Sequence, residues 1–199
     1  AGVEAICCVP PFFYPRSHEE IVEHYRVVAA AADLPLFAYN LPSSTGVEIT
    51  PDLMGKMQDG VPQLAGLKHS SSNFFNVQVF ARMGLACFTG SAALLLPAMT
   101  LGAVGCVDGP PNMAPERWVE IWNAYNDGDL KRAEAAQAKA SEVFELFGEF
   151  GYLPCVKAVL GYRLGIDCGD PLPPASGLSA EQIERLGQRA EELGLGRVN

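Results

Sequence analysis

The chain has 199 residues, a formal net charge of -9 at pH 7 and 49% apolar residues. This composition can bury a sizeable core, and the acidic balance argues against nucleic acid or an anionic membrane as the main partner, because either would repel the chain on average. No uncharged apolar run reaches the roughly 18 residues of a membrane span and no basic leader segment occurs. We therefore expect a cytoplasmic protein that binds small molecules.

Five short apolar runs occur along the first half of the chain, at 5–9, 36–39, 64–68, 86–89 and 103–107. Each is too short for a helix and mostly apolar on both faces, which is typical of buried parallel strands. The stretches between them carry helix-start signals, such as the capping-box pair Ser17 and Glu20, and Thr50 before Pro51. This alternation predicts an α/β fold, either an open doubly wound sheet or a closed barrel.

Candidate polar residues follow several successive strands, which favours a (β/α)8 TIM barrel because a barrel gathers its strand ends into one mouth. Beyond about residue 115 the pattern is helical, with helices expected at 116–125, 129–147, about 153–164 and after the capping box of Ser179 and Gln182. Five strands are too few for a complete barrel. We therefore interpret 1–126 as the C-terminal portion of a barrel, about its last five β/α units, and 127–199 as a C-terminal helical region, with the first three units absent or supplied elsewhere.

The six cysteines, at positions 7, 8, 87, 106, 155 and 168, lack the spacing of a zinc site and the density of a disulfide scaffold. Most of them lie in apolar runs, so we interpret them as buried, reduced thiols. The three histidines do not cluster either. The sequence predicts no metal site.

Lys68 closes the run 64–67, and a lysine at the end of a barrel strand points into the catalytic mouth. A neutral amine there can attack a ketone and form an iminium, which acts as an electron sink for making or breaking the adjacent carbon–carbon bond. Tyr39 ends the preceding strand, and its phenol can shuttle protons at the same mouth. Considered separately, each residue also has a non-catalytic interpretation. Lys68 could be a surface lysine whose chain lies along apolar surface with its amine in water, and Tyr39 could be a tyrosine at the rim of the core.

Two motifs strengthen the catalytic interpretation. Tyr39-Asn40-Leu41-Pro42 with Thr45-Gly46, and Gly66-Leu67-Lys68-His69-Ser70-Ser71, resemble the tyrosine and Schiff-base motifs of the dihydrodipicolinate synthase and N-acetylneuraminate lyase (DapA-like) family of class I aldolases. The segments 9–14 and 101–107, with Asn112, resemble the loop after the family's fourth strand and its eighth strand. The resemblance covers nearly the whole chain.

The resemblance implies a (β/α)8 barrel that is usually a homotetramer, uses pyruvate or another 2-oxo acid, and needs no cofactor. It implies that Lys68 forms the Schiff base and that Tyr39 handles protons. It also assigns substrate contacts, with Val107 against pyruvate and Ser70, Thr45 and Gly90 near the second substrate. The family's glycine-threonine-threonine-glycine loop, which holds the pyruvate carboxylate, precedes the matching segment, so we expect a complete site to need residues outside this sequence.

Three departures from the family pattern bear on the substrate. Ser44 stands where the synthases usually carry an arginine for the second substrate's carboxylate, and a hydroxyl cannot replace a bidentate guanidinium. Phe13 stands at the second tyrosine of the synthase proton relay. Residues 91–93 lack the acidic side chains with which sialic acid lyases bind sugar hydroxyls. These departures predict a pyruvate-dependent aldolase or lyase for a smaller substrate, such as a 4-hydroxy-2-oxo acid or a 2-keto-3-deoxy sugar acid.

The alternatives are a dihydrodipicolinate synthase proper (4-hydroxy-tetrahydrodipicolinate synthase) and a non-catalytic barrel that senses 2-oxo acids. Retention of both Lys68 and Tyr39 argues against the sensor. A nucleotide-binding open sheet would need a glycine-rich phosphate loop, and the sequence contains none of the usual forms. His69 should point away from Lys68 if side chains alternate along the strand, which predicts a packing role for it.

Overall fold

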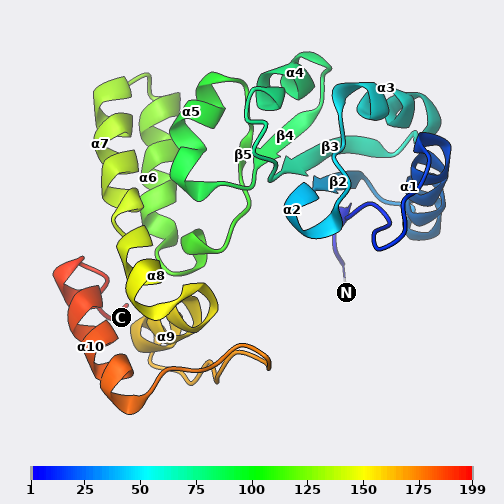
Figure 1. The fold of residues 1–199 in the computed structure, drawn as a ribbon. Helices are drawn as coiled ribbons and strands as arrows, with labels where there is room; N and C mark the ends of the chain where they lie inside the picture. The colour runs from blue at the N-terminus through cyan, green and yellow to red at the C-terminus, as the bar shows by residue number, and fades with distance from the viewer. Residues whose placement is uncertain (1, 199) are drawn as a thin grey trace. The chain divides into compact units, whose positions relative to one another are not determined.

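The computed structural model describes residues 2–198, which form two compact units that divide between Val107 and Asp108 (Figure 1). The first unit contains a sheet and its helices, and the second is helical. The boundary expected after residue 126, between barrel and helical region, stays a prediction.

The first unit is built on a five-stranded parallel sheet whose strand order follows the chain, β1-β2-β3-β4-β5. The strands are β1 (Ile6–Cys8), β2 (Leu36–Asn40), β3 (Leu64–His69), β4 (Ala86–Thr89) and β5 (Gly105–Cys106). Each overlaps one of the five apolar runs, so the predicted strands and their parallel arrangement are confirmed. Within the described residues, β1 and β5 are the two edges of the sheet.

Helices connect successive strands in this unit. They are α1 (His18–Ala32), α2 (Pro42–Thr45), α3 (Pro51–Gly60), α4 (Asn76–Arg82), the 3-10 helix η1 (Ala92–Leu94) and α5 (Leu95–Thr100). The predicted capping box at Ser17 and Glu20 is present at the start of α1, and the Thr50 hydroxyl caps α3 with Pro51 in the first turn. The short helix α2 occupies the loop after Tyr39.

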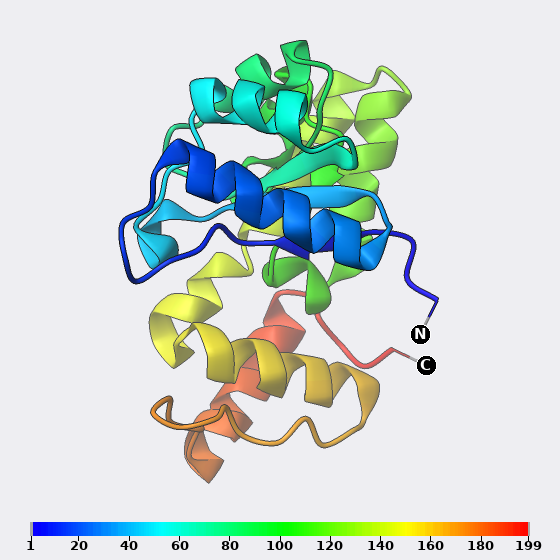
Figure 2. The same ribbon diagram turned by 90° about the vertical axis from the view of Figure 1, so that its right-hand side faces the viewer.

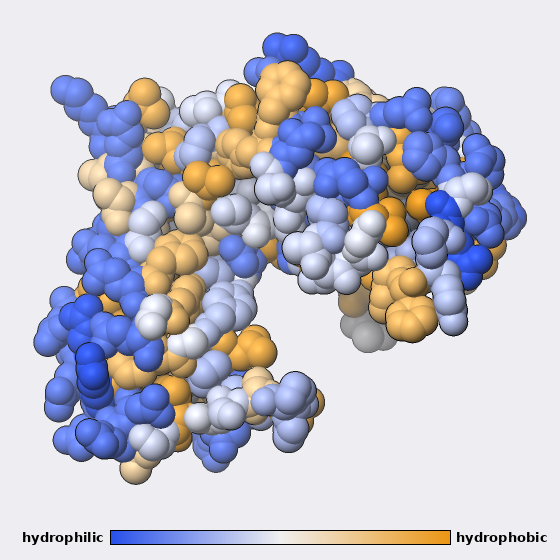
Figure 3. Space-filling model, viewed as in Figure 1, coloured by the Kyte–Doolittle hydropathy of each residue, from blue (hydrophilic) through white to orange (hydrophobic). Residues whose placement is uncertain are grey.

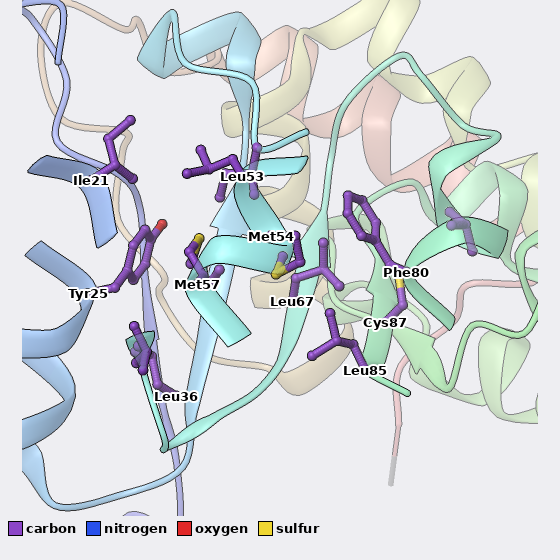
Figure 4. Packing of buried hydrophobic residues seen from close by; sticks show 14 of the residues in the cluster. Ile21, Tyr25, Leu36, Leu53, Met54, Met57, Leu67, Phe80, Leu85 and Cys87 are labelled. Carbon is purple, nitrogen blue, oxygen red and sulfur yellow. The ribbon is translucent and has the colours of Figure 1, made fainter. Parts of the chain in front are cut away.

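One face of the sheet is covered by α1, α3 and α4, and the hydrophobic core lies between them (Figure 1). Met54 from α3 and Leu67 from β3 lie next to each other there, with Phe80 from α4 close by (Figure 4). The burial pattern of β2 alternates, so every second side chain enters this core. The intervening side chains, among them Tyr39, therefore lie on the opposite face.

The second unit consists of η2 (Pro110–Asn112), α6 (Pro115–Asn126), α7 (Leu130–Ser141), α8 (Phe144–Phe150), α9 (Tyr152–Leu164) and α10 (Ala180–Glu192). Helices α9 and α10 pack against each other (Figure 2). The capping box of Ser179 and Gln182 opens α10 as predicted, and the outward surfaces of α1 and α10 are mostly hydrophilic (Figure 3). No helix within residues 2–198 is both long and apolar enough to cross a membrane.

The prediction of a single helix over 129–147 is wrong, because the structure has two helices there, α7 and α8. The Ser141 hydroxyl donates to the Gln137 carbonyl at 2.8 Å, a side-chain bond of the kind that bends helices. The following backbone bonds span three residues, from Val143 N to Ala140 O and from Leu146 N to Val143 O. The chain therefore tightens here into a 3-10-like turn. Gly148 lies inside α8, and Gly151 ends α8 with a φ of 74°.

Candidate active site

The candidate active site begins with two side chains at the carboxyl ends of neighbouring strands. Tyr39 on β2 is the register partner of Lys68 on β3, and both are half-buried on the face of the sheet opposite the helices. The Lys68 Nζ lies over the Tyr39 ring, 4.0 Å from its centroid. A cation at this position is attracted by the negative face of the ring. The structure thus brings together the two residues that the sequence placed in the catalytic roles.

A small apolar hollow of about 210 Å³ surrounds the lysine on this face. Phe37 and Phe88 form part of it, with their ring centroids 5.7 Å apart in an edge-to-face arrangement. Val107, predicted to lie against pyruvate, lines the same hollow. An apolar wall around an amine favours a small organic ligand with few polar groups close to the nitrogen.

Gly66 allows the strands to approach each other beside this hollow. A Cβ at this position would lie 2.1 Å from the backbone oxygen of Ala86 and 2.8 Å from the Phe37 ring. Neither contact is sterically possible, so β3 needs glycine two residues before Lys68 on the same face. This accounts physically for the glycine of the Gly66-Leu67-Lys68 motif.

His69 points away from Lys68 into the helix-covered face, as strand alternation predicted. Its Nδ1 lies 3.1 Å from the Asn40 amide nitrogen and its Nε2 lies 3.1 Å from the Asn73 carbonyl oxygen. Since the amide nitrogen and the carbonyl oxygen can act only as donor and acceptor, Nδ1 accepts and Nε2 carries the proton. Burial lowers the pKa of His69, although the Asn73 carbonyl and the Glu48 carboxylate act in the opposite direction. His69 is therefore a neutral packing residue that joins β3 to its neighbours.

Asn40 fixes the chain immediately after Tyr39. It is fully buried; its Oδ1 accepts from Ile49 N at 2.9 Å, and its carbonyl accepts from Ser70 N at 2.8 Å. These bonds join the exit of β2 to the exit of β3. The backbone positions of Tyr39 and Lys68 are consequently set by one buried polar network.

A second, larger hollow of about 610 Å³ lies at the carboxyl ends of β2, β3 and β4. Ser70 and Gly90, both predicted to approach the second substrate, line it. They are packed tightly, because a Cβ on Gly90 would lie 1.8 Å from the Ser70 hydroxyl and 2.8 Å from its Cβ. Glycine at position 90 therefore makes room for Ser70.

Thr45 and Ser44 occupy α2 and line neither of these two hollows. The Thr45 hydroxyl bonds within its own loop, donating toward the carbonyls of Leu41 and Val47 and accepting from Val47 N. Ser44 is exposed. The structure does not bring these two side chains to Lys68, and their roles in substrate binding stay predictions.

Other residues at the site were not anticipated. Cys7 was expected to be buried, but it is exposed on the face of the sheet that carries Lys68 and lines the same hollow, because alternation along β1 turns it away from the core. Glu48, which the sequence did not single out, lines the larger hollow.

Phe13, at the position of the second relay tyrosine, is 84% exposed and has a φ of 81°, an uncommon conformation for a non-glycine residue. Among residues 2–198, no group of three histidine, cysteine or acidic side chains is arranged to hold a metal ion.

A family model described as "Dihydrodipicolinate synthetase family" matches residues 1–193. The chain belongs to this family. An uncharacterized DapA-like lyase of Halobacterium salinarum is 37% identical over 196 residues, which are 98% of this chain and 64% of that protein. An N-acetylneuraminate lyase of Salmonella agona is 29% identical over 197 residues, covering 96% of this chain and 66% of that protein. The crystal structure of dihydrodipicolinate synthase from Aquifex aeolicus superimposes with a TM-score of 0.86 at 25% identity, covering 100% of this chain and 68% of that one.

Membership of the dihydrodipicolinate synthetase family confirms the resemblance seen in the motifs around Tyr39 and Lys68. Its solved members are TIM barrels, so the five parallel strands of this chain form part of such a barrel, followed by C-terminal helices. The chain spans about two-thirds of the length of the curated relatives it matches, 64% of the Halobacterium protein.

Proposed function

We propose that the protein is a pyruvate-dependent class I aldolase or lyase in which Lys68 forms a Schiff base with a 2-oxo acid. The observation that carries this proposal is the position of the Lys68 Nζ, 4.0 Å from the Tyr39 ring centroid at the ends of neighbouring parallel strands. The apolar hollow around the lysine fits a three-carbon oxo acid. Family membership supports the same chemistry.

In the proposed reaction, the neutral Lys68 amine attacks C2 of the oxo acid, and the Tyr39 phenol protonates the departing hydroxyl, which leaves as water. The resulting iminium accepts the electron pair of the C3–C4 bond as that bond breaks. The Tyr39 phenolate takes the proton of the C4 hydroxyl, so that C4 leaves as an aldehyde. Tyr39 then returns the proton to C3. Water hydrolyses the iminium to pyruvate and the free amine, and the proton released in this step returns to the Tyr39 phenolate.

The favoured substrates are a 4-hydroxy-2-oxo acid and a 2-keto-3-deoxy sugar acid. Ser44 supports this choice over a synthase that uses a carboxylated aldehyde, because its hydroxyl cannot form the paired bonds of a guanidinium to a carboxylate. The larger hollow, moreover, is lined by no lysine or arginine among the described residues. We further propose that the active form is a homo-oligomer, as the family resemblance implies.

The experiment that tests the function is a cleavage assay in which released pyruvate is reduced by lactate dehydrogenase and NADH. The complete protein should release pyruvate from a 2-keto-3-deoxy sugar acid, and Lys68→Arg should abolish the release because a guanidinium does not form the iminium. Lys56→Arg is the matched control, since Lys56 is a surface lysine paired with Asp52 and should leave the rate unchanged. Equal pyruvate release by wild type and Lys68→Arg would refute the proposed role of Lys68.

A further inference from the structure

The larger hollow at the strand ends contains one acidic side chain. Five serines and Glu48 contribute most of its polar lining, and Glu48 is the only acidic lining residue among the described part of the chain. His69 also borders the hollow, but both of its ring nitrogens are engaged, in the bonds to Asn40 and Asn73. The charge available to a ligand in this hollow is therefore negative.

Glu48 is held in place by neighbours that leave acceptor capacity on its carboxylate. The Ser71 hydroxyl donates to Oε2 at 3.0 Å, and the buried Asn40 amide lies 3.4 Å from Oε1. A carboxylate has about four lone-pair sites, and these two contacts use at most two of them. The carboxylate is positioned by the same asparagine that follows Tyr39, and it can still accept from a ligand.

Ser70 provides a second, independent indication of a ligand in this hollow. Its hydroxyl oxygen is buried and has no hydrogen-bond partner within residues 2–198, although buried hydroxyls are normally paired. Ser70 lies two residues after Lys68, directly beyond the end of β3. The hollow that Ser70 lines therefore begins at the end of the strand that carries Lys68.

We propose that Glu48 is a substrate-binding residue that accepts a hydrogen bond from a hydroxyl of the aldehyde half of the substrate. The hollow would then select a small neutral hydroxyaldehyde and disfavour an aldehyde with its own carboxylate, which the Glu48 charge repels. This inference rests on the proposed function and narrows it to 2-keto-3-deoxy sugar acids over unsubstituted 4-hydroxy-2-oxo acids. The acceptor comes from the loop after α2, whereas residues 91–93 after β4 supply no acidic group.

The test compares Glu48→Gln with wild type on two substrates, a six-carbon 2-keto-3-deoxy sugar acid and 4-hydroxy-2-oxopentanoate, which has no further hydroxyl. A hydrogen bond to a charged group contributes about 1.5–3 kcal/mol, so kcat/KM for the sugar acid should fall roughly tenfold to a hundredfold. The value for 4-hydroxy-2-oxopentanoate should stay unchanged. Glu23→Gln, at an exposed glutamate of α1 paired with Arg26, is the matched control.

A measurement on wild type keeps the proposal testable if Glu48→Gln fails to fold. In the condensation direction, pyruvate should react faster with glyceraldehyde than with succinic semialdehyde, which carries a carboxylate. An equal loss on both cleavage substrates, no loss on either, or a wild-type preference for succinic semialdehyde would overturn the role of Glu48. Borohydride trapping of pyruvate on Lys68 distinguishes failure of the Glu48 role from failure of the proposed function. If one of these outcomes is found and pyruvate is still trapped on Lys68, only the Glu48 role is refuted and the proposed Schiff-base function remains.

Discussion

The nitrogen of Lys68 faces the ring of Tyr39. Tyr39 therefore offers this nitrogen an aromatic ring face in addition to its hydroxyl, and substitutions can remove the two separately. The ring face stabilises a positive charge on the nitrogen, both in the ammonium and in the proposed iminium. The phenolic hydroxyl carries the proton that the proposed bond cleavage requires. Aromatic and aliphatic replacements therefore have different expected effects.

Tyr39→Phe should keep the ring face and lose the proton shuttle. We expect kcat for cleavage to fall by about 10²–10⁴-fold, the usual contribution of a general acid–base group. Pyruvate should still form a Schiff base on Lys68, but more slowly, because the phenol no longer protonates the departing hydroxyl. Tyr39→Leu should lose both properties and also reduce the yield of borohydride-trapped pyruvate. Steady-state kinetics and intact-mass measurements on the two variants check this expectation. Identical trapping yields in Tyr39→Phe and Tyr39→Leu would contradict the role of the ring face.

His69 makes the stability of the first unit depend on pH. Burial lowers its pKa, so the folded protein binds the proton less readily than the unfolded chain does. The stabilisation is fully present above the unfolded pKa of about 6.5 and is lost as the pH falls from there through the lower folded pKa. Urea unfolding midpoints measured at a series of pH values should therefore decrease below this point. They should decrease less steeply in His69→Gln.

His69→Gln should also cost about 1–3 kcal/mol at neutral pH, because it disturbs the bonds to the Asn40 amide and the Asn73 carbonyl. A wild-type pH slope in His69→Gln would show that another group causes the dependence.

The helices of the second unit are joined through two buried arginines. The Arg163 side chain of α9 is 8% exposed, donates to the Met113 carbonyl, and forms a two-pronged pair with Glu116 of α6 at 2.6 and 3.3 Å. Arg117 of α6 donates to the Lys139 carbonyl at the end of α7 and to the Leu193 carbonyl after α10. These bonds satisfy carbonyls at the ends of helices and of η2, which otherwise lack partners.

Arg163→Leu should destabilise the second unit by about 3 kcal/mol, because it leaves buried carbonyl groups without a donor. Arg185→Leu is the matched control, since the Arg185 side chain is 66% exposed and its pair with Glu149 contributes little. Thermal unfolding of the two variants, followed by circular dichroism, measures the difference. Equal losses for Arg163→Leu and Arg185→Leu would contradict the role assigned to burial.

Across the whole molecule, local signals in the sequence predicted most of the architecture. The strands follow from short apolar runs, and the starts of α1, α3 and α10 follow from caps that act within four residues. The division between α7 and α8 was not predictable in this way, because it depends on the rotamer of Ser141 within a continuous helical pattern. The family and its barrel fold were predictable because the motifs around Tyr39 and Lys68 are specific.

The candidate site was predictable only in part. The spacing of strand ends places Lys68 beside Tyr39, but the stacking of the amine on the ring depends on packing that no local pattern encodes. Glu48 was missed because its significance arises from contacts with Asn40 and with Ser71, 23 residues away. The exposure of Cys7 was missed because an apolar run shows which residues lie in a strand and not which face each one occupies.

The central claim is that Lys68 is the amine that binds the 2-oxo acid, and borohydride trapping tests it most directly. The complete protein is incubated with pyruvate and sodium borohydride, digested, and analysed by peptide mass spectrometry. We predict a reduced pyruvyl adduct on Lys68, its absence from Lys68→Arg, and its retention in Lys56→Arg. An unmodified Lys68 in wild type, or an adduct on another lysine that persists in Lys68→Arg, would contradict the claim.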